Sequence, residues 1–363
     1  MKSQFLLGLL VALILISLAT WLALSRTTED LTHITPCANT TEPLFITPQG
    51  EVTDALVRLL GLTGIRVEED LLTVENDWPE ARIHLKSRKL EEVVSAVQGK
   101  LDPFITWFGD PSKERWEEDP KKPKLSRLQA NHIIDICLGS LRQGEKMLSQ
   151  VPPKAILFLG AALTRVRMRL AYLNELYDQK KLSTDLPVYI MAGERKLDES
   201  IGETQENLMD SGNGIVPFRK DWTASQEHII DEGEMVKLVF SQSRHRDLAE
   251  KNVIIVYSPK GQGRRATTET NLKQWLKEHS PLAGKYLAIS NQPYNYFQEC
   301  VIRRVLLQAG RSDICVEVVG PGMEVKVESD EAAIDQAKNL LNNLSRILYE
   351  LQEIRKFRMS DHR

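Results

Sequence analysis

The sequence has little of three features that often mark a function: cysteine, net charge and a signature motif. Its four cysteines show no CxxC spacing, which argues against a zinc finger and a thioredoxin-like motif. The net charge is only −3 over 363 residues, so the composition gives no reason to expect nucleic acid as a partner. Neither HExxH nor GxSxG occurs. We therefore predict no metal site and no nucleic-acid partner, and the sequence leaves any cofactor unknown.

One long apolar run stands out from an otherwise globular composition. Phe5 to Leu24 has about the 20 residues that a membrane-spanning helix needs. Because a secretory signal has a shorter apolar core, roughly 7–15 residues, we favour an uncleaved anchor, with cleavage near Ser25 as the alternative. Lys2 precedes the run, which favours a body on the extracytoplasmic or periplasmic side. The expected order is a single-pass cell-membrane anchor (1–25), then a linker (26–50).

Five short apolar segments between residues 155 and 320 predict the fold. None alternates strictly between polar and apolar residues, which is typical of strands buried on both faces of a parallel sheet. The segments are Ala155–Gly160, Pro187–Gly193, Val253–Tyr257, Tyr286–Ser290 and Cys315–Gly320. Each leads through a small or polar loop into a helical pattern. We therefore predict an α/β domain over 124–328, a mostly parallel sheet with helices on both faces.

A smaller unit precedes this domain. Residues 51–123 show helical patterns near 52–63 and 88–98 around a possible strand at 65–74, which predicts a small α+β extension. A long helix is then expected from about Leu125 to Ser149, before two prolines.

The chain closes with an amphipathic helix, residues 329–363. Its apolar residues recur alternately every three and four positions from Ile334 to Leu351, so they form one seam. We favour docking of this seam on the protein's own core, and a protein partner through the helix is the alternative.

Candidate ligand residues follow the apolar segments, because ligands of parallel sheets collect outside the carboxyl ends of the strands. Gly160 is followed by arginines at 165, 167 and 169, and Arg165 is nearest to the strand end. Alternate residues cannot share one helical face, so at most two of the three point toward a ligand. The other strand ends supply Gly193, Glu194, Ser290 and Asn291.

The loop after the third segment, Lys260 to Asn271, combines glycines and basic side chains with a helix start. Thr267 or Thr268 is the expected N-cap of that helix. Free backbone N–H groups at such a start form an anion-binding nest. The loop is neither a Walker motif nor a GxGxxG fingerprint, because no third glycine follows Gly263. An ordinary capped loop with solvated arginines is the alternative.

Taken in order, these segments resemble the YdcF-like and SanA-like family of bacterial proteins. The family has a small-residue turn and a helical Arg after its first strand, similar to Gly160 with Arg165 or Arg167 here. Its second strand ends in a Ser-Gly-Gly-like turn, and Ala192-Gly193-Glu194 occupies that place. An acidic helix start with a Met shortly after resembles Glu232 to Val236.

The family's Asn-Thr-x-Glu-Asn signature is matched in part. Thr268 and Asn271 fit it, and Thr270 replaces the Glu. Tyr294 or Tyr296 stands where the family has a His. The resemblance implies a Rossmann-like α/β fold, often with an N-terminal membrane segment, and a cleft for a nucleotide-like ligand such as S-adenosylmethionine.

Three functional hypotheses follow. The first is a membrane-anchored envelope protein that binds a small anionic or nucleotide-like ligand and acts in envelope maintenance, its cleft lined by Arg165, Thr268, Asn271, Ser290 and Asn291. The second is a transferase or hydrolase of a phosphorylated or nucleotide-linked substrate, with Glu234 or Glu194 as the base. The third is a non-catalytic interaction scaffold.

Overall fold

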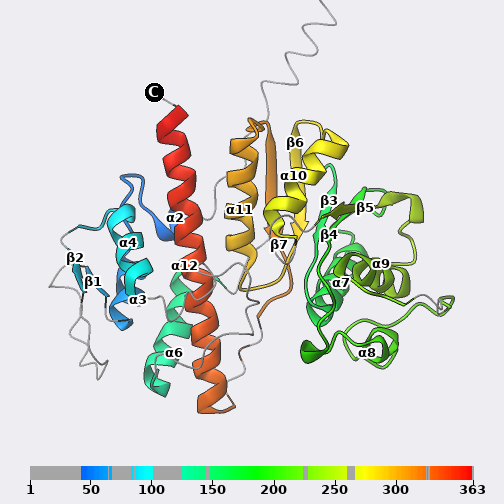
Figure 1. The fold of residues 1–363 in the computed structure, drawn as a ribbon, viewed down its shortest axis with the longest axis horizontal. Coiled ribbons are helices and arrows are strands. Elements are labelled where there is room, and N and C mark those ends of the chain that lie inside the picture. The colour runs from blue at the N-terminus through cyan, green and yellow to red at the C-terminus, as the bar shows by residue number, and fades with distance from the viewer. Residues whose placement is uncertain are drawn as a thin grey trace, which may run out of the picture. The chain divides into compact units, whose positions relative to one another are not determined.

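The computed structural model describes residues 42–63, 65–67, 83–85, 87–100, 125–143, 148–223, 228–259, 266–323, 325 and 328–361. The helices are α2 (Glu42–Phe45), α3 (Asp54–Leu62), α4 (Leu90–Lys100), α6 (Arg127–Asp135), α7 (Leu163–Asp178), α8 (Gln205–Met209), α9 (Glu232–Ser243), α10 (Thr268–His279), α11 (Asn295–Gln308) and α12 (Asp330–Asp361) (Figure 1). A π-helical turn (η1, Ile136–Ser140) and two 3₁₀ turns (η2, Glu199–Ile201; η3, Glu250–Asn252) add to them. The strands are β1 (Ile65–Val67), β2 (Ile83–Leu85), β3 (Ile156–Leu159), β4 (Val188–Gly193), β5 (Val253–Ser258), β6 (Gly284–Ile289) and β7 (Ile314–Val319).

The five predicted apolar segments form one parallel sheet in the order β5-β4-β3-β6-β7. Ile156 in β3 pairs with Val188 on one side and with Leu287 on the other. This confirms that the segments lie side by side and point the same way. The chain begins at the central strand, builds toward one edge and then toward the other, so the order reverses between β3 and β6. Parallel sheets bind ligands at such a reversal.

Both faces of this sheet are covered, as predicted. Ile156 and Phe158 of β3 pack in one hydrophobic cluster with residues of α7 and α9. Leu157 and Leu159, which point to the opposite face, pack with residues of α10 and α11. The central strand is therefore buried on both sides, which explains why its sequence is apolar throughout.

A third cluster lies outside the sheet and joins α3, α4, α6, α11 and α12. The apolar seam of α12 is buried in it: Leu341, Leu344, Leu348 and Leu351 are each 1% exposed. This confirms the docking of the seam on the protein's own core, and a protein partner would have to use another side of α12. In Figure 1, α12 stands between α11 and the helices α4 and α6.

The segment before the large sheet contains the predicted helices as α3 and α4. Of the predicted strand at 65–74, Ile65–Val67 forms β1, which pairs in parallel with β2. The buried residues of α3 and α4 belong to the same cluster as those of α6 and α12. The extension therefore shares its core with the rest of the chain.

The helix predicted from Leu125 to Ser149 is shorter than expected. It begins with a capping box in which Ser126 and Gln129 exchange side-chain and backbone hydrogen bonds. It ends with the π-helical turn at Ser140, and Arg142 then adopts a left-handed backbone conformation with φ of 47°. An α-helix cannot continue through such a residue.

The predicted anchor, Phe5 to Leu24, lies outside the described residues. Within the described ranges, no helix combines the length and the apolar composition needed to cross a bilayer.

Candidate functional site

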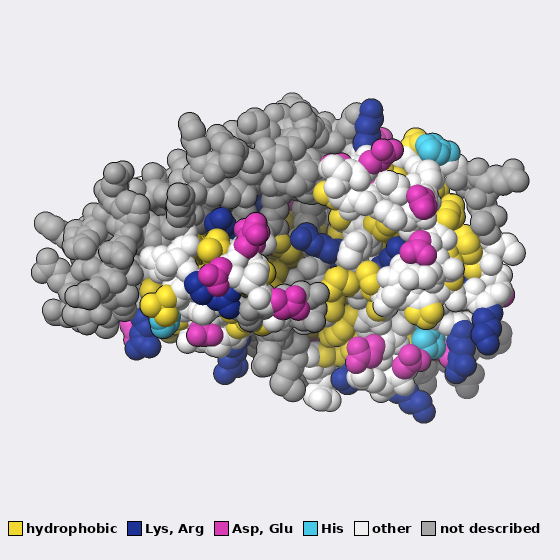
Figure 2. Space-filling model, turned by 90° about the horizontal axis from the view of Figure 1, so that it is seen from below, with side chains coloured by type: hydrophobic (Ala, Val, Ile, Leu, Met, Phe, Trp, Pro, Cys, Tyr) yellow, Lys and Arg dark blue, Asp and Glu magenta, His cyan; other side chains and the backbone are white. Residues whose placement is uncertain are grey.

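A cavity of about 280 Å³ opens at the carboxyl ends of β3 and β4, where the order of the sheet reverses. The starts of α7, α9 and α10 form its walls together with α11 and α12. Its lining includes Gly160, Ala162, Arg165, Arg169, Arg195, Glu232, Thr267, Thr268, Glu269, Asn271, Tyr294, Phe297, Arg304, Arg346 and Glu350. The face of the molecule drawn in Figure 2 is hollowed near its centre, where hydrophobic and charged side chains meet.

We call Gly160, Arg165, Arg169, Arg195 and Glu232 the sheet end of the cavity. The helix end consists of Glu269, Arg304, Arg346 and Glu350, which come from α10, α11 and α12.

Two of the three arginines of α7 reach the cavity, as the sequence spacing allows. Arg165 and Arg169, four residues apart, line it. Arg167 points away and donates hydrogen bonds to the carbonyl oxygens of Asn207, at 2.6 Å, and Leu208, at 3.3 Å. The guanidinium carbon of Arg165 lies 5.1 Å from the ring centroid of Tyr294, and this exposed side chain forms no ion pair within the described residues.

Arg169 is a buried cation held by neutral groups. Its Nη1 donates to the carbonyl oxygens of Leu159 and Gly160, both at 2.7 Å. Its Nε and Nη2 donate to Oδ1 of Asn291, at 3.0 and 2.6 Å. A guanidinium has five N–H groups, so one on Nη2 keeps no acceptor in the described part of the chain. Burial and, to a smaller extent, the charge of Arg165 lower the pKa of Arg169, and the carboxylate of Glu232 opposes this shift.

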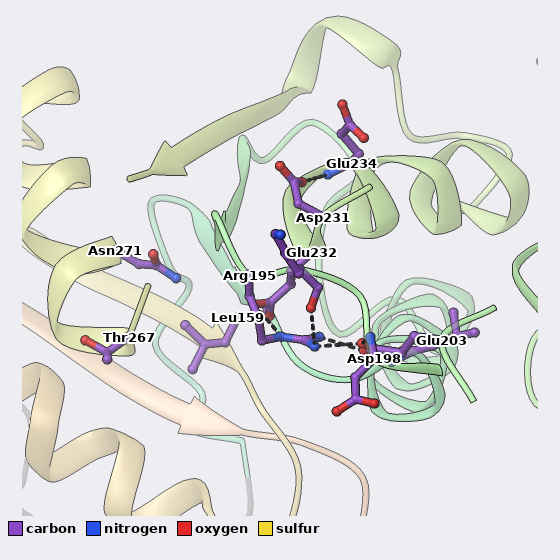
Figure 3. Close-up of polar contacts among 12 residues, drawn as sticks. Leu159, Arg195, Asp198, Glu203, Asp231, Glu232, Glu234, Thr267 and Asn271 are labelled. Atoms are coloured by element: carbon purple, nitrogen blue, oxygen red, sulfur yellow. Dashed lines mark hydrogen bonds and ion pairs between the residues drawn. The ribbon is translucent and has the colours of Figure 1, made fainter. Parts of the chain in front are cut away.

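Arg195 is also buried, but carboxylates surround it (Figure 3). Its two terminal nitrogens donate to the two oxygens of Glu203, each at 2.6 Å, and its Nε lies 3.3 Å from Oε2 of Glu232. Burial alone lowers the pKa of Arg195, but the hydrogen bonds and charges of the two glutamates outweigh it and raise the pKa above its ordinary range. Glu203 also accepts from the backbone N–H groups of Leu163 and Asp198. This pair therefore ties the start of α7 to the segment after β4.

Glu232, the first residue of α9, places its carboxylate directly beside Gly160. A Cβ atom at Gly160 would lie 2.5 Å from Oε1 of Glu232 and 3.0 Å from the carbonyl oxygen of Met191. Only a glycine leaves room for the carboxylate at the end of β3. Asp231 fixes the helix start, because its Oδ1 accepts the N–H of Glu234 at 2.9 Å.

The start of α10 is capped as predicted, and Thr267 is the N-cap. Its Oγ1 accepts the N–H of Thr270, and Oγ1 of Thr270 accepts the N–H of Thr267 at 2.7 Å. Thr270 thus closes a capping box. Asn271 donates to the carbonyl oxygen of Met191 at 3.0 Å, while its buried Oδ1 has no hydrogen-bond partner. The glycines of the predicted nest, Gly261 and Gly263, lie outside the described residues.

At the helix end, Arg304 bridges three helices. It donates to Glu350 of α12 at 2.6 Å and to Glu269 of α10 at 2.8 Å. Arg346 lies over the ring of Phe297, 5.4 Å from its centroid. Arg304 is therefore neutralised by two carboxylates.

Four of the predicted ligand residues line the cavity: Gly160, Arg165, Thr268 and Asn271. Ser290 and Asn291 lie beneath it, buried, and Asn291 holds Arg169. Gly193 and Glu194 do not line it. A Cβ at Gly193 would lie 2.4 Å from that of Ala266, so this glycine serves the packing of β4 against the start of α10.

The two glutamates considered as bases are both outside the cavity lining. Glu234 points away from the cavity, and its Oε2 accepts the backbone N–H of Ile230 at 2.9 Å (Figure 3). The N–H of Glu194 donates to the carbonyl oxygen of Ser258. The carboxylate that lines the sheet end is Glu232.

Sequence reasoning missed Arg169, Glu232 and the helix end. The i, i+4 spacing of Arg165 and Arg169 was a usable signal, since it selects the pair that shares a helical face. Glu232 had no comparable signal, because Glu234 lies in the same first turn of α9. Of the two tyrosines at the family's His position, Tyr294 lines the cavity, and Tyr296 packs edge to face on Phe45 instead.

Within the described ranges, no three His, Cys, Asp or Glu side chains are grouped so that they could hold a metal ion. In comparisons with known proteins, no family model, no curated protein and no solved structure matches the chain.

Proposed function

We propose that the cavity binds a small anionic ligand through a phosphate group. The observation that carries the proposal is Arg169, a buried guanidinium with no carboxylate partner in the described part of the chain and one N–H left over. A buried charge is costly unless a counter-charge accompanies it. An anion in the cavity would supply that counter-charge.

The surroundings of Arg169 support the same ligand. Arg165 adds a second guanidinium on the same helical face. The N-cap of α7 is Ala162, which offers no side-chain acceptor. Glu203 accepts the N–H of Leu163, and no side chain within the described residues accepts those of Thr164 and Arg165. A helix start of this kind attracts phosphate through its N–H groups and its dipole. Two arginines and a helix start together favour a phosphate oxygen cluster over a single acceptor atom.

The charge of the cavity limits the charge of the ligand. Five arginines and three glutamates line the cavity. A fourth glutamate, Glu203, does not line it but pairs with Arg195. Among the described residues, one positive charge is therefore in excess. A ligand whose phosphate carries a single negative charge fits best.

The proposal extends to the wider setting of the protein. The strand order, with its reversal at the cavity, fits a Rossmann-like fold, and Gly160, Arg165, Thr268 and Asn271 of the resemblance to YdcF-like and SanA-like proteins line one cavity. With the apolar run Phe5 to Leu24, this supports a membrane-anchored member of that family, acting in envelope maintenance from the extracytoplasmic side. Protease digestion of intact and permeabilised cells tests that location: loss of the body only after permeabilisation of all membranes would contradict it.

Calorimetric titration of the full chain in detergent with inorganic phosphate, pyrophosphate and AMP tests ligand binding. We expect binding of at least one of these probes. Arg165→Gln should weaken it about 10-fold or more, because a hydrogen bond to a charged group contributes about 1.5–3 kcal/mol. Arg246→Gln is the matched control, since Arg246 is exposed and does not line the cavity. If the protein binds none of the three probes, the proposed function is wrong, and the result favours the hypothesis of a non-catalytic interaction scaffold.

A further inference from the structure

Glu232 lies at the sheet end of the cavity, directly beside the carboxyl end of β3. Its side chain is 10% exposed and lines the sheet end of a cavity that has an excess of positive charge. Its Oε1 lies beside Gly160, at the end of β3 and three residues before the first residue of α7. The carboxylate is therefore next to the place where the phosphate of a ligand would lie.

Arg195 does not need Glu232 as its counter-charge. Glu203 already binds both terminal nitrogens of Arg195 in a bidentate pair, with both distances at 2.6 Å. The contact between Glu232 and Arg195 is a single, longer one of 3.3 Å to Nε. This contact orients the carboxylate while Glu203 matches the charge (Figure 3).

A carboxylate beside an anion is unfavourable for binding alone, because like charges repel. It is useful when a water molecule must lose a proton near the phosphorus atom. A positioned base of this kind accelerates a reaction by about 10²- to 10⁴-fold. Arg165 and Arg169 are placed to stabilise the charge that develops on the phosphate oxygens.

We propose that Glu232 is the general base in the hydrolysis of a phosphate diester bound in this cavity. The inference rests on the proposed function and names its substrate class. Glu232 takes one proton from a water molecule, and the oxygen of this water forms a bond to phosphorus. The bond from phosphorus to one ester oxygen breaks, and the leaving oxygen keeps the electron pair and takes a proton from solvent. Glu232 then returns its proton to solvent.

A diester fits better than a monoester for reasons of charge. A diester carries one negative charge, which equals the excess positive charge of the described residues at the cavity. A monoester dianion would bring a second negative charge toward the carboxylate of Glu232. Among the described residues, the charged groups near Glu232 include Arg195 after β4, Arg169 on α7, Glu203 on the far side of Arg195, and Asp231 and Glu234 at its own helix start.

The test uses the full chain in detergent with bis(p-nitrophenyl) phosphate as the diester and p-nitrophenyl phosphate as the monoester. The wild-type protein should hydrolyse the diester faster. Glu232→Gln should slow this reaction by about 10²- to 10⁴-fold. Glu232→Asp, which keeps the charge but withdraws it from the cavity, should also lose rate. Glu234→Gln is the matched control on the same helix turn and should change the rate by less than about twofold, because Glu234 does not line the cavity.

Phosphate binding, measured by calorimetry on the same samples, separates the two proposals. Glu232→Gln should bind inorganic phosphate at least as tightly as the wild-type protein, since a negative charge is removed. If phosphate binds but the diester is not hydrolysed, or is hydrolysed equally by Glu232→Gln, the role of Glu232 is refuted and the binding function stands. Faster hydrolysis of the monoester overturns the substrate class. Absence of phosphate binding together with absence of hydrolysis refutes both.

Discussion

The two ends of the cavity use arginine in opposite ways. At the helix end, Arg304 is neutralised by Glu350 and Glu269, so that one ion-pair network joins α12, α11 and α10. At the sheet end, Arg169 is held by backbone carbonyls and by Asn291, and Arg165 stands over an aromatic ring. Both ends contain buried cations, but Arg304 at the helix end pairs with two carboxylates, whereas Arg169 at the sheet end has no carboxylate partner among the described residues.

This difference separates structural charge from functional charge. A paired cation that joins three helices helps to hold them together. Its removal leaves the partner carboxylates without a counter-charge. A cation held by neutral acceptors keeps an uncompensated positive charge, which an anionic ligand can neutralise. The two ends should therefore respond differently to substitution: the helix end in stability, and the sheet end in ligand binding.

The largest effect is expected at Arg304. Arg304→Met removes the shared partner of two glutamates, and Glu350 is 6% exposed in its side chain. Leaving a buried charge without its partner costs about 3–5 kcal/mol. Urea denaturation should show this loss in the free energy of unfolding. Phosphate affinity, measured at a temperature where the variant is folded, should fall less than in Arg165→Gln, because Arg304 is already matched by two carboxylates.

Lys273 provides the control for this comparison. It pairs with the same Glu269, but its side chain is 56% exposed. Lys273→Gln should cost less than about 1 kcal/mol. Equal losses in the two variants would show that the helix end is not the network described here.

An intermediate effect is expected at Gly160, where a substitution should change both the stability of the fold and the activity of the site. In Gly160→Ala, the new Cβ would displace the carboxylate of Glu232 and press on the carbonyl oxygen of Met191. Overpacking of this kind costs about 1–3 kcal/mol. Thermal unfolding measures this cost, and hydrolysis of bis(p-nitrophenyl) phosphate should fall because Glu232 is moved. Gly322→Ala, where no atom lies within 4 Å of the added Cβ, should have neither effect.

The sheet was predictable because each strand is apolar on both faces and has its own local signal. Ile156 and Leu157 point to opposite faces, yet both are buried. The strand therefore reads as a continuous apolar run in the sequence. The strand-end residues followed from the same logic, and four of them line one cavity.

The rest of the cavity depends on contacts between distant segments. Arg304 and Glu350 are 46 residues apart and meet only because α11 and α12 pack together. Asn291 and Arg169 are separated by 122 residues. The choice between Glu232 and Glu234 depends on which side of a helix turn faces β3, and two acidic residues within one turn carry no local signal for that choice. The length of the helix expected from Leu125 to Ser149 could not be predicted either. Its helical pattern continues in the sequence, but a positive φ at Arg142 ends the helix.

The smallest effect concerns the pH dependence of the helix end. Burial raises the pKa of Glu269, but its hydrogen bonds to Arg304 and Lys273 outweigh burial, and the net shift is downward. A carboxyl group with a lowered folded-state pKa stabilises the fold above its unfolded-state pKa, and this contribution is lost as the pH falls through the folded-state value. Glu350 acts in the opposite sense, because burial raises its pKa.

The wild-type curve alone would therefore mix two opposing trends, and the difference between the wild-type protein and Glu269→Gln isolates one of them. We expect this difference in unfolding free energy to be at most about 1 kcal/mol at about pH 7, because Glu269 is 32% exposed. It should shrink as the pH is lowered below the ordinary pKa range of a glutamate, because the carboxyl group then becomes protonated. A difference that stays constant over this range in urea titrations would mean that Glu269 acts through packing, and the helix end would then owe less to ion pairing than its geometry indicates.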